Sequence, residues 1–188
     1  MQDMAAIRAA LDLMHVPTRV RVVRASELPA GISKVLAIAA GDDEALAAAA
    51  NATERSPEVL RQAAVFFVEQ ALLFHDADSY RVLGGTRATP SGELRRHLAL
   101  LLRWLHPDAN LQDRAALVAR VTNAWEDLKT PERRKAYDDA HQPAAVSHRK
   151  TRARRRRSGA SKAGDDYGET GGGFREMLRR LLLRRPVG

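Results

Sequence analysis

The sequence predicts an all-α protein built as one small domain with appendages. Its apolar content rests on alanine and leucine, whereas aromatic residues make up only 5% of the chain, which favours packed helices over sheets. Apolar residues recur at helical spacing through residues 32–74 and 94–128. Helix-start signals, a capping residue followed by proline, occur at Ser56-Pro57, Thr89-Pro90 and Thr130-Pro131.

Composition also narrows the classes of function. The chain has no cysteine, which excludes disulfides, a thiolate nucleophile and a zinc ribbon. Its histidines are scattered without an i,i+4 pair, and no phosphate loop appears, so we expect no enzyme activity, no metal and no cofactor. Asp3, Arg8 and Asp12 interrupt any apolar export signal, and the most apolar window, 63–74, is too short to span a bilayer. We therefore expect a cytoplasmic protein.

Residues 1–30 are expected to form a poorly defined extension. An alanine-rich helix is compatible with residues 1–15, but Pro17 discourages its continuation. Residues 18–24 alternate arginine and valine, which suits a short strand. Because a lone strand has no pairing partner here, a loop or frayed segment is the expected outcome.

Residues 31–75 predict an N-terminal helical segment of three short helices at most. Asp42 is the predicted N-cap of one helix, and Ser56 caps the next. The side chains expected to face the core are Val59, Ala63, Phe66, Phe67 and Leu73. This segment buries too little apolar surface alone, so we expect it to pack on the region that follows.

Residues 76–140 predict a helical hairpin with a short helix at each end. The first helix begins near Asp78 and ends at Gly84, and Thr89 is the predicted cap of the second. The third helix runs from about Asp113 to Leu128. The predicted inward-facing residues are Leu94, Leu98, Leu101, Leu102 and Leu105 on one arm and Val118, Val121, Trp125 and Leu128 on the other.

Four motifs follow one another in this region. They are DSYRVLG at 78–84, His106-Pro107-Asp108, AWEDL at 124–128 and PERRKAYD at 131–138. His-Pro-Asp alone is compatible with an ordinary helix-ending loop, but the ordered set resembles the J-domain, the co-chaperone module of the DnaJ family. The resemblance implies that the domain is held together by Tyr80, Leu83, Leu98, Leu102, Val118, Trp125, Leu128, Arg134 and Tyr137.

The resemblance also implies a function. A J-domain docks on a DnaK-type chaperone and stimulates its ATP hydrolysis in protein folding and stress response, without performing chemistry itself. Pro107 would stiffen the turn, and Asp108 would accept a charge-assisted contact from a partner arginine. The docking set implied for this chain is His106, Pro107, Asp108, Arg95, Arg96 and Arg103, and the lack of cysteine excludes the family's zinc module.

The chain departs from the family pattern on the second helix. Ala99-Leu100 replaces the usual basic pair, and Trp104 stands where a charged residue is common. The loss of central charge should weaken or slow docking. Leu100 and Trp104 are either covered by the helices of 32–74, which we expect, or exposed to a different partner.

The C-terminal part has a different composition. Residues 141–173 are basic and glycine-rich and are expected to be disordered, whereas 174–185 has the spacing of an amphipathic basic helix. A run of like charge comprises Arg149, Lys150, Arg152, Arg154, Arg155, Arg156 and Arg157. This run could bind nucleic acid or an anionic membrane, or it could be a solvated linker. The alternative function is thus an adaptor on nucleic acid or membrane that uses a J-like scaffold with weak chaperone docking.

Overall fold

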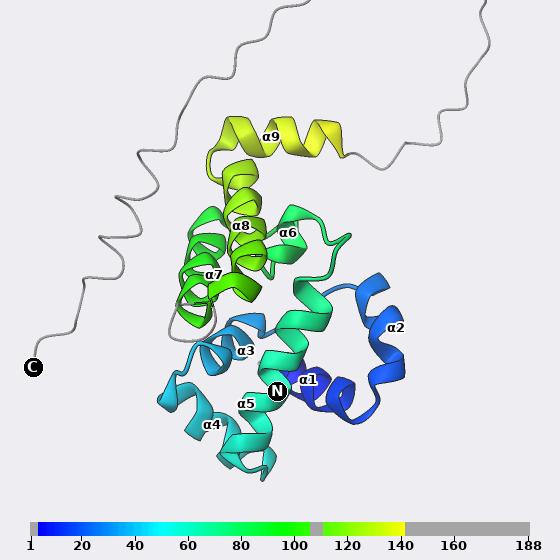
Figure 1. Cartoon of the computed structure of the whole chain (residues 1–188), viewed down its shortest axis with the longest axis vertical. Helices are drawn as coiled ribbons and strands as arrows, with labels where there is room; N and C mark the ends of the chain where they lie inside the picture. Colours follow the sequence, from blue (N-terminus) through cyan, green and yellow to red (C-terminus); the bar gives the residue numbers. More distant parts are fainter. Residues whose placement is uncertain (1–3, 106–110, 142–188) are drawn as a thin grey trace, which may run out of the picture. The chain divides into compact units, whose positions relative to one another are not determined.

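The computed structural model describes residues 4–105 and 111–141, and these residues form helices and no strand (Figure 1). The all-α prediction is therefore confirmed. The helices are α1 (Ala5–His15), α2 (Val20–Ala25), α3 (Ile32–Ala39), α4 (Asp43–Thr53), α5 (Pro57–Phe67), α6 (Ser79–Val82), α7 (Ser91–Trp104), α8 (Leu111–Leu128) and α9 (Pro131–Ala140).

Helix α5 is the centre of the N-terminal segment. It contacts α1, α3 and α4, and its side chains Leu60, Ala63 and Phe67 are buried. The predicted caps are confirmed, because Asp42 accepts a hydrogen bond from the N–H of Ala45 at 2.9 Å and Ser56 caps α5. Helices α3, α4 and α5 each carry an apolar stripe and share one core, as the spacing of 32–74 predicts.

The N-terminal extension contains the helix expected before Pro17 and differs from the expectation beyond it. Residues 5–15 form α1, which buries Ile7, Leu11 and Leu13 against neighbours that include α5. Residues 18–24 are neither a strand nor a frayed loop: Pro17–Arg19 forms a 3-10 turn and Val20–Ala25 forms α2. The valines have weak helix propensity, so the helix depends on tertiary contacts, described below, that override this preference.

Helices α6 to α9 form the predicted hairpin with a short helix at each end (Figure 1). Helices α7 and α8 are antiparallel. The end of α7 meets the start of α8, where Arg114 donates to the carbonyl of Trp104, and Arg134 beyond α8 reaches Ser91 at the start of α7. Helix α3 packs against α7, so the N-terminal segment lies on this module as expected.

Two caps were predicted in the module, of which Thr130 is confirmed and Thr89 is wrong, while the first helix begins near Asp78 as predicted. Asp78 caps α6, and Thr130 caps α9 with Pro131 in its first turn. Helix α7 instead begins after Pro90 without a side-chain cap. The hydroxyl of Thr89 accepts the backbone N–H of Thr86 at 2.9 Å, so it closes the preceding turn and is not available to the helix.

Most residues predicted to face inward are buried. The exceptions are half-buried, and they are Val59, Phe66, Leu102 and Val118. These four lie at the edges of the apolar stripes, where the angular position on the helix still leaves part of a side chain open to solvent.

A π-helix, Val68–Leu72, continues α5 and joins the two halves of the structure. Its last carbonyls lack the usual helical partners and are bonded by arginines instead. Arg24 of α2 donates to the carbonyl of Gln70 at 2.7 Å, Arg81 of α6 to that of Ala71 at 2.9 Å, and Arg120 of α8 to that of Leu73 at 2.6 Å. The junction is thus held by charge-assisted bonds from both sides.

Candidate functional site

The outer face of α7 carries the predicted basic residues. Arg95, Arg96 and Arg103 are exposed, and none makes an ion pair or side-chain hydrogen bond within residues 4–105 and 114–141. At about 100° per residue they fall within an arc of about 100° on the helix surface. Ala99 lies inside this arc, one turn from Arg95 and one turn from Arg103. The face is therefore positive, with an uncharged residue at its centre.

The opposite side of α7 is buried. Leu94, Leu98, Leu101 and Leu105 belong to the core of the domain. Trp104 is only 9% exposed to solvent, and Leu100 is half-buried. The tryptophan is thus buried, and the expectation that the helices of 32–74 cover it stays a prediction. Part of its cover is the guanidinium of Arg114, which lies 5.3 Å from the ring centre in a cation–π contact. The same side chain fastens α8 to the end of α7.

His97 is the buried polar residue of α7, with 2% exposure. Its Nδ1 lies 2.9 Å from the carbonyl of Leu83, and its Nε2 lies 2.7 Å from the hydroxyl of Ser33 in α3. A carbonyl only accepts, so Nδ1 carries the proton and Nε2 accepts from Ser33. Burial lowers the pKa of His97, against smaller opposing effects of the Leu83 bond and of Glu93. The neutral ring therefore links α3 to the module.

This geometry predicts that stability decreases in mild acid. The unfolded chain takes up a proton on His97 near pH 6.5, whereas the folded chain resists it to a lower pH. The stability that comes from the neutral His97 ring is complete above about pH 6.5 and is lost as the pH falls towards the pKa of His97 in the folded protein. Urea unfolding of the native protein between about pH 7.5 and 5.5 should show this slope, and His97→Gln should reduce it.

His75→Gln is the control for this experiment. The His75 side chain is 92% exposed and contacts the equally exposed Asp76, so its replacement should change the slope less than His97→Gln does. Equal slopes for the native protein and His97→Gln would contradict the assignment.

The His-Pro-Asp turn itself, residues His106, Pro107 and Asp108, lies outside the described residues. The structure describes α7 before it and α8 after it. The carbonyl of Trp104 accepts the Arg114 guanidinium at 2.9 Å, so the two helix ends that flank the turn are held together. The tail residues of the predicted anion-binding run, and the predicted helix at 174–185, also lie outside the described part, and their roles stay predictions.

The last motif holds α9 against α6 and the loop that precedes α7. Arg134 donates to the hydroxyl of Tyr80 at 3.0 Å and to the carbonyl of Arg87 at 2.7 Å. Tyr137 accepts the N–H of Ser79 at 2.9 Å, and Asp138 accepts the Tyr80 hydroxyl at 2.9 Å. Burial, assisted by the bond to Asp138, raises the pKa of Tyr80. Arg134 and Tyr137 thus occupy scaffold positions, as the sequence indicates.

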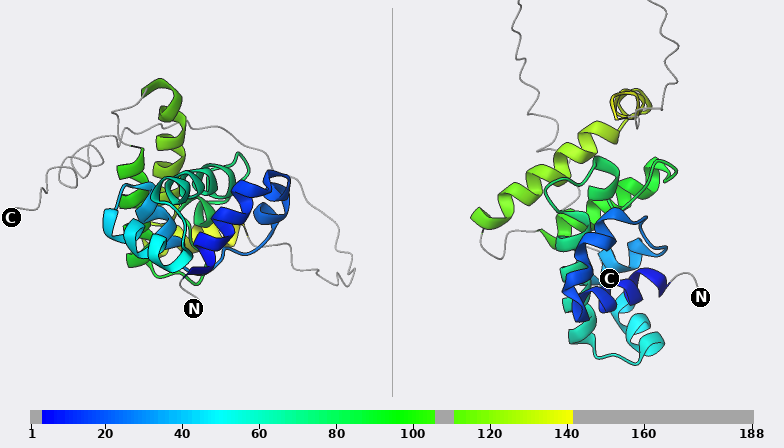
Figure 2. Two further views of the ribbon diagram at one scale, coloured as in Figure 1. Left: turned by 90° about the horizontal axis from the view of Figure 1, so that it is seen from below. Right: turned by 90° about the vertical axis from the view of Figure 1, so that its right-hand side faces the viewer.

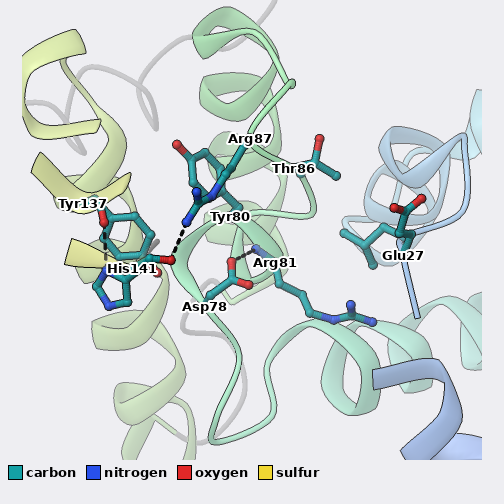
Figure 3. A pocket seen from close by; sticks show the side chains of 10 residues that line it. Glu27, Asp78, Tyr80, Arg81, Thr86, Arg87, Tyr137 and His141 are labelled. Carbon is teal, nitrogen blue, oxygen red and sulfur yellow. Dashed lines mark hydrogen bonds between the residues drawn. The ribbon is translucent and has the colours of Figure 1, made fainter. Parts of the chain in front are cut away.

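A pocket of about 260 Å³ opens beside this network. Tyr137 and His141, stacked at 4.1 Å between ring centres, form one wall, and Glu27 of the N-terminal extension lies opposite (Figure 3). The polar groups of Tyr80 and Arg81 in its lining already have partners inside the protein. Among the described residues no cluster of three side chains suits a metal, and no helix is long and apolar enough to cross a membrane.

Sequence reasoning missed two of the residues that hold this site. His97 follows Leu94 by three positions and precedes Leu101 by four, so its place in the buried stripe was visible in the spacing. Arg81 had no such signal, because its partners Ala71, Val23 and Ser26 are brought together only by the fold.

Comparison with known proteins gives one coarse result. The chain is 30% identical over 112 residues to a DnaJ-like protein of Synechocystis sp., which covers 57% of this chain and 33% of that protein. The chain therefore spans about a third of the length of the curated relative it matches. No family model matches the chain, and no solved structure matches it. The similarity and the all-helical module together support a J-domain-like protein.

Proposed function

We propose that this protein is a J-domain co-chaperone that docks on a DnaK-type chaperone and stimulates its ATP hydrolysis through His106-Pro107-Asp108. The observation that carries the proposal is the basic arc of Arg95, Arg96 and Arg103, which has no partner among the described residues and lies on the helix that leads into this tripeptide. The similarity to a DnaJ-like protein supports the same function.

The proposed docking rests on charge. Exposed guanidinium groups without internal partners attract an acidic surface, and they raise the rate of encounter more than the final affinity. Asp108 would then accept a charge-assisted hydrogen bond from the chaperone. The protein itself would perform no bond-breaking step, so its residues act on the rate of hydrolysis only through the partner.

The test is single-turnover ATP hydrolysis by a bacterial DnaK-type chaperone. The native protein should accelerate hydrolysis, and Asp108→Asn, which keeps the side-chain shape and removes the charge, should abolish most of the acceleration. Absence of stimulation by a native protein of full helicity would overturn the proposal.

Replacing Ala99 should strengthen docking. Ala99→Lys puts a charge at the centre of the basic arc, where an exposed ion pair with the partner is worth roughly 0.5–1 kcal/mol. The concentration needed for half-maximal stimulation should fall about twofold to fivefold. The three arginines one turn away on α7 repel this lysine by about 0.2–0.5 kcal/mol each, but this cost acts on folding rather than on docking.

Ala99→Gln separates charge from size in this measurement. Glutamine lengthens the side chain without a charge, so it should leave the half-maximal concentration close to that of the native protein. Equal effects of lysine and glutamine would contradict a role for charge at this position, and the effect of lysine should shrink at high salt.

A further inference from the structure

The segment between α1 and the end of α2, residues 16–25, is a corner of the structure, and we call it the elbow. Helix α2 lies at the periphery and packs on the π-helix (Figures 1 and 2). On that side Arg24 donates to Gln70 and lies over the ring of Phe74, and Arg81 donates to the carbonyl of Val23. Its other side faces solvent.

Two apolar side chains of the elbow are exposed. Val16 is 43% exposed and Val22 is 60% exposed, and they are the large apolar side chains of the described region that stand in solvent. Val20 and Val23, by contrast, are half-buried on the side that faces the molecule. The fold thus makes no use of Val16 and Val22, although each exposes apolar surface to water.

The same segment is strongly basic. From residue 13 to residue 26 the chain carries three arginines and no acidic residue. Arg24 is bonded to Gln70, but Arg19 and Arg21 are exposed and make no ion pair or hydrogen bond within the described part of the chain. The elbow therefore carries two guanidinium groups without a partner in the described part of the chain and, in the same ten residues, two exposed valines.

We propose that the elbow is a docking surface for an anionic lipid bilayer. Arginine near such a surface gains from the negative potential of the headgroups, and apolar side chains gain by entering the boundary between headgroups and acyl chains. A bilayer therefore uses both features of the elbow. A nucleic acid would engage the arginines only, and residues 13–26 contain no aromatic ring on which a base could stack.

This surface is separate from the proposed chaperone-docking face. Helices α2 and α7 lie at opposite sides of the ribbon in Figure 1. Binding at the elbow therefore does not require the arginines of α7, and the inference does not rest on the proposed co-chaperone function.

Sedimentation of the full chain with vesicles tests the inference. The probes are vesicles of phosphatidylcholine alone and of phosphatidylcholine mixed with phosphatidylglycerol, at physiological ionic strength. The native protein should sediment with the mixed vesicles only. Arg19→Gln with Arg21→Gln should lower the partition coefficient about 25-fold, since each arginine near an anionic surface contributes roughly fivefold. Val16→Ser with Val22→Ser should lower it severalfold at unchanged charge.

Arg95→Gln with Arg96→Gln is the matched control, because it removes the same charge from another exposed helix. It should change vesicle binding less than twofold, whereas the elbow variants should retain stimulation of the chaperone in vesicle-free solution. Failure of the native protein to bind mixed vesicles, or equal losses in the elbow and control arginine pairs, would overturn the proposal. Loss of duplex RNA binding in the arginine variant, with no effect of the serine pair on vesicles, would instead assign the elbow to nucleic acid.

Discussion

Gly84→Ala should destabilise the protein by about 2–5 kcal/mol. The backbone of Gly84 has φ +66°, where an L-residue costs about 1–2 kcal/mol. A Cβ there would also lie 2.7 Å from the Cγ2 of Ile32, and the resulting overpacking costs about 1–3 kcal/mol more. Since Ile32 is buried at the start of α3, the variant should loosen the contact between the N-terminal segment and the module. Urea unfolding measures the loss.

Comparison with Gly41→Ala separates the steric part of the Gly84→Ala effect from the conformational part. Gly41 has a similar φ of +78°, but a Cβ there would meet no heavy atom within 4 Å. Its replacement should cost only the conformational part, about 1–2 kcal/mol. If the two variants lost equal stability, the close approach of Gly84 to Ile32 would not contribute.

Arg81→Gln should cost about 2–4 kcal/mol. The guanidinium donates to the carbonyls of Ala71, Ser26 and Val23 at 2.9, 2.8 and 2.6 Å. A part-buried hydrogen bond to a charged group contributes about 1.5–3 kcal/mol, and glutamine can replace one of the two of this kind, to Ala71 and Val23. The bond to Ser26 is exposed and contributes only about 0.5–1 kcal/mol. Burial lowers the pKa of Arg81, but the group stays charged at neutral pH. Because these carbonyls belong to α2, to the residue after it and to the π-helix, the variant should release α2 from the rest of the structure.

The release of α2 can be measured separately from global stability. Amide hydrogen exchange of residues 20–25 should accelerate in Arg81→Gln more than exchange in α8 does. Arg61→Gln is the control of equal charge: its ion pair with Asp43 is 3.6 Å long and exposed, so its loss should cost less than about 1 kcal/mol. Unchanged exchange in α2 would show that the three bonds do not hold the elbow.

The elements that the sequence predicted well are those specified locally. Asp42 and Ser56 cap helices through an N–H only three residues away, so their role is visible in a short stretch of sequence. The apolar stripe of α7 was visible for the same reason, because helical spacing alone brings Leu94, Leu98 and Leu101 to one side.

Two predictions failed, one because of a competing local hydrogen bond and one because of long-range partners. Threonine is a common helix cap, but the hydroxyl oxygen of Thr89 accepts the N–H of Thr86. The turn before α7 and the first turn of α7 compete for this oxygen. For the elbow, the local sequence predicts a loop. The guanidinium of Arg81, more than fifty residues later, donates to the carbonyls of Val23 and Ser26, and no residue near the elbow indicates this contact.

By itself, the sequence determined an all-helical chain, the order of its four motifs and the basic character of the helix before His106-Pro107-Asp108. These depend on residue type and on spacing within one or two turns. The tertiary structure alone decided that α3 bonds to α7 through His97 and Ser33, which are 64 residues apart, and that α2 is a helix. A buried polar group needs a hydrogen-bond partner, and which residue lies close enough to be that partner depends on the tertiary structure.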